Sequence, residues 1–306
     1  MEFWNLAIRI IFLSQTTTGI LGNFFLMFYY LVLYYRECTL KTMDLILVNL
    51  MVANALVILS SGVPQTMAVW GLKQFLDDFA CRLLVYIQGV ARSVSIGTTC
   101  LLSVFQAITI NPRKSFWKDH KVKAEKYIAC YIFTVWVLYL LINFIFFVNP
   151  FTKRNRKNLT RKRVFEYCST VGHDEINDSL YAALVVCPEF FFSVLIAWAS
   201  GSMIVILYRH KQRVQHIHST RLSRKTSPES RATQNILALV STFLAFYTLS
   251  SILRGCIALL HNHSWWLANI SPFISLCFPS FGSFVLLNHN SVMPRLSFVW
   301  RRNKTS

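Results

Sequence analysis

Three ionisable side chains lie inside otherwise apolar stretches of this 306-residue sequence, and they are its strongest candidates for binding chemistry. They are Arg92, Glu189 and Arg254. A charge within a bilayer is costly, so such residues commonly face a cavity or one another and mark a functional site. If all three point inward, they place a few polar groups in a mostly apolar cavity, which suits a small organic ligand. The alternative is that Glu189 and Arg254 only neutralise each other, and the sequence leaves both interpretations open.

Signatures of catalysis and of metal binding are missing from the sequence. Two segments carry paired histidines, His216-Ile-His218 and His261-Asn-His263, but neither has a neighbouring carboxylate or thiolate to complete a metal site. We interpret both pairs as loop histidines. No GxSxG, HExxH or P-loop pattern occurs. The sequence therefore predicts a protein that is not an enzyme and that uses no metal or other cofactor.

Composition and charge distribution exclude a soluble protein. Hydrophobic residues make up 54% of the chain and charged residues only 14%, whereas a soluble domain carries about 25% charge. Long runs, such as 10–35 and 45–72, contain no charged residue at all. The net charge of +18 lies in the loops, where membrane lipids with anionic headgroups, and not nucleic acid, are the expected counterions.

Five uncharged runs and two further apolar stretches are each long enough for a transmembrane helix, which needs about 20 residues. The two further stretches hold Arg92 and Glu189. The predicted fold is an all-α membrane protein, a seven-transmembrane helix bundle that forms a single domain over residues 1–306. The spans are expected near residues 9–34, 44–70, 80–110, 127–149, 180–208, 232–260 and 266–288.

Basic residues indicate the orientation of this bundle. With the N-terminus outside, the cytoplasmic segments carry 19 Lys or Arg and the outer segments carry 8, as the positive-inside rule requires. The basic cluster 153–163 in the second outer loop goes against the rule, although acidic residues dilute it. We therefore expect the N-terminus outside and the C-terminus in the cytoplasm. The first span serves as its own insertion signal, because no cleavable signal peptide is recognisable.

Cysteines and glycosylation sequons fit this orientation. Cys81, at the outer end of the third span, and Cys168, in the second outer loop, both face the oxidising side. We favour a disulfide between them, and two free thiols are the alternative. Sequons in the outer loops begin at Asn158, Asn177 and Asn262, and Asn158 lies in the most polar, exposed stretch.

Glycines in two spans predict close contacts between helices. Gly19 and Gly22 lie in the first span and Gly201 lies in the fifth. Where a glycine faces a neighbouring helix, the two backbones approach more closely than a larger side chain permits. We therefore expect helix contacts at all three positions.

Basic residues also surround the cytoplasmic mouth of the bundle. Positive-inside topology explains them fully. The functional interpretation is a docking face for an intracellular partner, opened when a ligand shifts the helices between two arrangements. The candidate residues of this face are Arg209, Lys211, Arg213 and Arg231.

Several blocks of sequence, taken together, are specific enough to indicate a family. They are Gly62–Met67, Ser95–Ile110, Ser179–Ala183, Trp198–Met203, Arg209–His218, Ser227–Gln234 and Phe246–Ser251. These blocks extend over nearly the whole chain and strongly resemble the vomeronasal type-1 receptors, a family of G-protein-coupled receptors. Relative to rhodopsin-like receptors in general, some landmarks differ. Ser103-Val-Phe105 stands in place of Asp-Arg-Tyr, Phe278-Pro-Ser-Phe281 replaces Asn-Pro-x-x-Tyr, and Asn54 lies near the usual sodium-binding Asp.

The resemblance implies a chemosensory pheromone receptor in the plasma membrane. It implies a small organic ligand, volatile or steroid-like, and a heterotrimeric G protein of the inhibitory type as partners. The alternative from another class is a multi-pass channel or carrier for small solutes. That alternative predicts ligand-dependent flux, whereas a receptor promotes nucleotide exchange on a G protein without flux.

Overall fold

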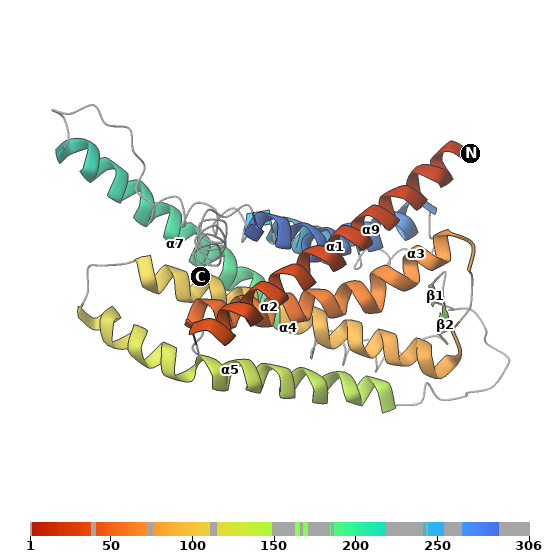
Figure 1. Cartoon of the computed structure of the whole chain (residues 1–306), viewed down its shortest axis with the longest axis horizontal. Coiled ribbons are helices and arrows are strands. Elements are labelled where there is room, and N and C mark those ends of the chain that lie inside the picture. Colours follow the sequence, from red (N-terminus) through yellow and green to blue (C-terminus); the bar gives the residue numbers. More distant parts are fainter. Residues whose placement is uncertain are drawn as a thin grey trace, which may run out of the picture.

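Long helices dominate the structure and lie side by side in an elongated bundle (Figure 1). The computed structural model describes residues 2–37, 41–72, 76–110, 115–148, 163–165, 168–170, 184, 187–217, 241–242, 244–253 and 265–287. Within these residues, five helices are long and apolar enough to cross a membrane. Two shorter apolar helices, Leu244–Leu253 and Ile270–Phe284, lie within the predicted sixth and seventh spans.

Most of the secondary-structure elements are helices. The long and short α-helices are α1 (Glu2–Glu37), α2 (Thr42–Val57), α3 (Val63–Val69), α4 (Asp78–Ile110), α5 (Ser115–Val148), α7 (Cys187–Ile217) and α9 (Trp265–Leu287). A π-helical turn, η1 (Ile58–Gly62), joins α2 to α3. Strands β1 (Arg163–Phe165) and β2 (Cys168–Thr170) pair antiparallel. The segment Leu244–Leu253 is named the sixth-span helix below.

Helix α4 lies at the centre of the bundle, with α2, α5 and α7 packed against it. Its residues 90–100 are buried on every side of the helix. Helix α1, by contrast, exposes large apolar side chains such as Phe24, Phe25 and Phe28, which are suited to contact with lipid. A helix that is buried all round belongs to the interior of the bundle, so a polar residue on α4 lies among other helices.

Glycines allow α1 to approach α9 closely. A Cβ atom at Gly19 would lie 2.7 Å from Cδ1 of Ile58 and 3.1 Å from Cα of Ser280 in α9. A Cβ atom at Gly22 would overlap the hydroxyl of Ser283, also in α9. The close packing predicted for these two glycines is therefore confirmed.

Replacing Gly19 with valine is expected to destabilise the protein by about 1–3 kcal/mol, because α9 backbone must move to admit the side chain. The thermal unfolding midpoint of the purified protein measures this loss. Gly201→Val is the matched control, since a Cβ at Gly201 meets no described atom within 4 Å. Equal unfolding midpoints for the two variants would contradict the assigned contact.

Three features differ from the sequence predictions. Gly201 is exposed on α7 and makes no close contact with the described residues. Helix α5 begins at Ser115, well before the predicted span at 127–149, and α7 continues to Ile217, beyond the predicted end at 208. His216 therefore lies in a helix and not in a loop. Hydropathy marks only the part of a helix that suits lipid, whereas Lys, Arg, Gln and Glu also favour the helix beyond it.

Candidate ligand-binding site

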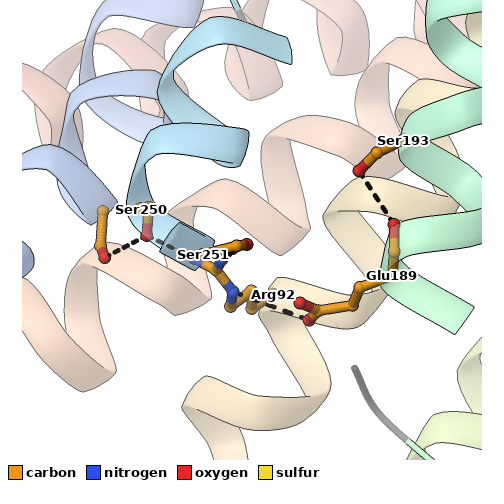
Figure 2. Close-up of polar contacts among 6 residues, drawn as sticks. Arg92, Glu189, Ser193, Ser250 and Ser251 are labelled. Carbon is orange, nitrogen blue, oxygen red and sulfur yellow. Dashed lines mark hydrogen bonds and ion pairs between the residues drawn. The ribbon is translucent and has the colours of Figure 1, made fainter. Parts of the chain in front are cut away.

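Arg92 is the centre of a buried polar cluster that joins three helices (Figure 2). Its Nε lies 3.6 Å from Oε1 of Glu189 in α7. Its Nη1 and Nη2 donate hydrogen bonds to Oγ of Ser250 (3.2 Å) and Oγ of Ser251 (3.1 Å), both in the sixth-span helix. The guanidinium also lies over the ring of Tyr247, with Cζ 4.1 Å from the ring centroid. One side chain of α4 therefore contacts both α7 and the sixth-span helix.

Helix geometry places the partners of Arg92. Tyr247, Ser250 and Ser251 are three and four residues apart, so all three lie on one side of the sixth-span helix. On α7, Pro188 occupies the first turn, where the N–H group that proline lacks has no helical partner in any case. Glu189 lies in the same turn, where the helix dipole stabilises a carboxylate.

Burial strengthens the contacts of this cluster and raises the cost of breaking them. The side chains of Arg92 and Glu189 are only 10% and 12% exposed. Water screens such a pair much less than a surface pair, but each charge is costly if its partner is removed. The planar guanidinium suits this combination of a carboxylate, hydroxyl groups and an aromatic face. The cluster therefore stabilises one particular arrangement of α4, α7 and the sixth-span helix.

A small cavity lies beside Arg92, between α2, α4, the sixth-span helix and α9. The space that the centre of a water molecule can occupy there measures about 20 Å³. This is room for about one water-sized group and not for a whole organic ligand, so the space is smaller than the sequence predicts. The lining residues are Val57, Arg92, Ser95, Phe246, Tyr247, Ser250, Ile274, Ser275, Phe278 and Pro279.

Two of the three predicted pocket residues, Arg92 and Glu189, lie together, and Arg254 lies outside the described residues. The sequence offered Arg254 as the structural partner of Glu189, whereas the described partner of the Glu189 carboxylate is Arg92. Sequence analysis did not single out Tyr247 and Ser250, although polar residues at helical spacing in an apolar stretch were an available signal.

Buried asparagines tie further helices together near the cavity. Oδ1 of Asn54 in α2 accepts a hydrogen bond of 2.9 Å from Ser95 in α4. Nδ2 of Asn23 in α1 donates to the carbonyls of Gly19 (2.8 Å) and of Pro279 in α9 (2.9 Å). Ser95 and Pro279 also line the cavity. The walls of the cavity are therefore held by hydrogen bonds between α1 and α9 and between α2 and α4.

The outer end of α4 carries Cys81, which is buried and belongs to a disulfide. The side chain of Cys168 lies outside the described side chains. The backbone of strand β2 begins at Cys168 and packs against α4, at the end of the bundle where α3 ends (Figure 1). The sequon residues Asn158, Asn177 and Asn262 lie outside the described residues.

The predicted cytoplasmic face begins on the extension of α7. Arg209, Lys211 and Arg213 all lie in this helix. The side chain of Arg209 is exposed, those of Lys211 and Arg213 are not described, and Arg231 lies outside the described residues.

Among the described side chains, no group of three or more His, Cys, Asp or Glu could hold a metal ion.

The bundle is similar to solved receptor structures. One is the "Crystal structure of squid rhodopsin", with a TM-score of 0.70, 14% sequence identity, and coverage of 98% of this chain and 87% of that chain. At this identity the likeness concerns the fold. It confirms the predicted all-α membrane bundle of seven helices, which has the fold of the rhodopsin-like G-protein-coupled receptors.

Sequence comparison then gives the family. Residues 6–299 match the "Vomeronasal organ pheromone receptor family". Vomeronasal type-1 receptor 4 of Homo sapiens is 46% identical over 290 residues, 95% of this chain and 96% of that protein. Vomeronasal type-1 receptor 2 of Homo sapiens is 47% identical over 95% of this chain and 74% of that protein. This chain belongs to the vomeronasal type-1 receptor family. It is a multi-pass pheromone receptor of the plasma membrane and not an enzyme.

Proposed function

We propose that this receptor detects a small organic molecule, volatile or steroid-like, on its outer side and activates an inhibitory-type heterotrimeric G protein in the cytoplasm. The observation that carries the proposal is the set of contacts by which Arg92 joins α4 to α7 and to the sixth-span helix. The cavity beside Arg92, mostly apolar with a few fixed polar groups, can hold one polar group of an organic ligand of low polarity. Residues 1–306 act together as one receptor domain.

The cluster around Arg92 gives the ligand a way to change the bundle. Binding beside Arg92 strengthens or replaces its contacts with Glu189 and Ser250, and these residues belong to two different helices. A ligand that favours one arrangement of those helices shifts the population of the receptor toward it. Arg254, two turns from the outer end of the predicted sixth span, completes the proposed pocket.

The cytoplasmic part of α7 is the proposed G-protein face. Arg209, Lys211 and Arg213 extend this helix beyond the predicted span, and Arg231 precedes the next span in the sequence. Because Glu189 lies in the first turn of the same helix, a displacement of α7 at the ligand site also moves its cytoplasmic end. A rigid helix is a direct route for such coupling.

The second outer loop is proposed to be fixed to α4 by a disulfide between Cys81 and Cys168. The disulfide-bonded state of Cys81 and the packing of β2 against α4 support this pairing. Glycans on Asn158, Asn177 and Asn262 are proposed for the same outer side, since all three sequons lie in predicted outer loops.

A ligand screen in cells tests the proposed function. Cells that express the receptor are exposed to small volatiles and steroids, and activation of a co-expressed inhibitory-type G protein is measured. We expect a responding ligand to lose potency on Glu189→Gln and on Arg254→Gln. Ser202→Ala is the control on α7, because its hydroxyl bonds the carbonyl of Ala199 in its own helix and no other described residue. A ligand that is equally potent on all variants would contradict the pocket assignment.

A further inference from the structure

The hydroxyls of Ser250 and Ser275 leave one proton to donate inside the bundle. Their oxygens lie 2.6 Å apart, between the sixth-span helix and α9. The two hydroxyls carry two protons, and the hydrogen bond between them uses one. Arg92 donates to Ser250 and so provides no acceptor. The second proton therefore meets no acceptor among the described residues.

The surroundings of this hydroxyl donor favour the binding of a hydrogen-bond acceptor. Ser250 is 1% exposed and Ser275 is half-buried, and both serines line the cavity beside Arg92. A fully buried donor without an acceptor costs about 1–3 kcal/mol, and a half-buried donor costs less. Hydrogen bonding to the guanidinium polarises the Ser250 hydroxyl, which strengthens the donor at the end of the chain. The cavity is therefore built to receive a hydrogen-bond acceptor.

The charge and the size of the cavity restrict which acceptor it can bind. Among the described residues, Arg92 is the charged side chain of the cavity wall, and Glu189 offsets its charge. An anion would add a second negative charge beside Glu189 at a buried site, where an uncompensated charge is strongly unfavourable. The space of about 20 Å³ has room for a single oxygen, so a carboxylate must give up its hydration before one of its oxygens enters.

We propose that the cavity between α4, the sixth-span helix and α9 binds one uncharged oxygen acceptor and rejects carboxylates. The oxygen belongs either to a water molecule or to the carbonyl or hydroxyl group of a ligand. The ligand part of this inference rests on the proposed function and names the chemical class of its ligand. Glu189 then determines specificity, because removing its charge leaves Arg92 available to an anion.

Binding of two matched probes to the purified receptor tests this inference. 2-Hexanone and pentanoate have the same number of non-hydrogen atoms. They differ at one position, where the ketone has a methyl group and the carboxylate has a charged oxygen. Apparent affinities come from the dependence of the thermal unfolding midpoint on probe concentration at neutral pH. No G protein is present, so a failure of G-protein coupling does not affect this measurement.

Four variants make the measurement specific. We expect Glu189→Gln to bind pentanoate at least about tenfold more tightly than the wild type does. Asp77→Asn, which changes an exposed carboxylate just before α4, is expected to behave as the wild type. We expect the double variant Ser250→Ala/Ser275→Ala to lose ketone binding at least about tenfold. Its control is Thr248→Ala, whose hydroxyl bonds carbonyls of its own helix.

The outcomes separate the two sources of the oxygen. Ketone binding by the wild type that depends on the serines assigns the oxygen to a ligand. Absence of ketone binding, together with pentanoate binding gained by Glu189→Gln, assigns it to water. Pentanoate binding by the wild type as tight as ketone binding would overturn the proposal, and this comparison needs no variant. Failure of a folded Glu189→Gln receptor to gain pentanoate binding would overturn it as well.

Discussion

Replacing Glu189 with alanine is expected to lower the free energy of unfolding of this receptor by about 3–5 kcal/mol. The carboxylate lies 3.6 Å from Nε of Arg92, and both side chains are almost fully buried. The variant leaves a guanidinium without its counterion among apolar helices, which is the costly state of a buried pair. Thermal unfolding of the purified receptor measures the loss.

A double-mutant cycle assigns the loss to the pair itself. We expect Arg92→Met and Glu189→Met each to destabilise the receptor strongly, and the double variant to recover most of the loss, because two apolar residues leave no charge unpaired. Arg82→Met replaces an exposed arginine of α4, the helix that carries Arg92. This variant is expected to change stability by no more than about 0.5 kcal/mol. Simple addition of the two single losses in the double variant would show that Arg92 and Glu189 do not act as a pair.

Loss of the disulfide at Cys81 is the second large effect. We expect Cys81→Ser and Cys168→Ser each to cost about 2–5 kcal/mol, because the outer loop loses its covalent link to α4. The double variant is expected to be no less stable than either single variant. Unfolding midpoints under non-reducing conditions give these differences.

Cys130 provides the control for this prediction. It is an exposed, free thiol on α5, so Cys130→Ser is expected to leave the unfolding midpoint unchanged. If Cys168→Ser behaves as Cys130→Ser does while Cys81→Ser remains destabilised, Cys81 has a partner other than Cys168.

The bundle could be predicted from the sequence because lipid imposes a simple rule on every span. Uncharged runs of sufficient length indicate helices without any knowledge of how they pack. The same rule does not determine where a helix ends outside the membrane, which is why the start of α5 and the end of α7 differ from the predicted spans. A close helix contact at Gly19 could be predicted from the sequence but its partner Ser280 could not, and the exposure of Gly201 depends on which face α7 turns outward.

The partner of Glu189 could not be predicted in the same way. The costs of burial indicate that Arg92 and Glu189 need partners, but the sequence contains no information on the rotation of α4 relative to α7. The sequence offered Arg254 as one possible partner of Glu189, whereas the described contact joins Glu189 to Arg92. The hydroxyls of Ser250 and Ser251 were overlooked because serine is common in membrane helices, where it usually bonds its own backbone. Only the packing of the sixth-span helix against α4 gives them a role.

Reconstitution with purified components tests most directly whether ligand binding on the outer side of this receptor drives G-protein activation on its cytoplasmic side. The receptor is inserted into lipid vesicles, an inhibitory-type heterotrimeric G protein is added, and nucleotide exchange and solute flux are measured in the same sample. With a ligand from the cell screen, we predict accelerated exchange on the wild type and no flux. Ligand-dependent flux without any change in nucleotide exchange would contradict the account.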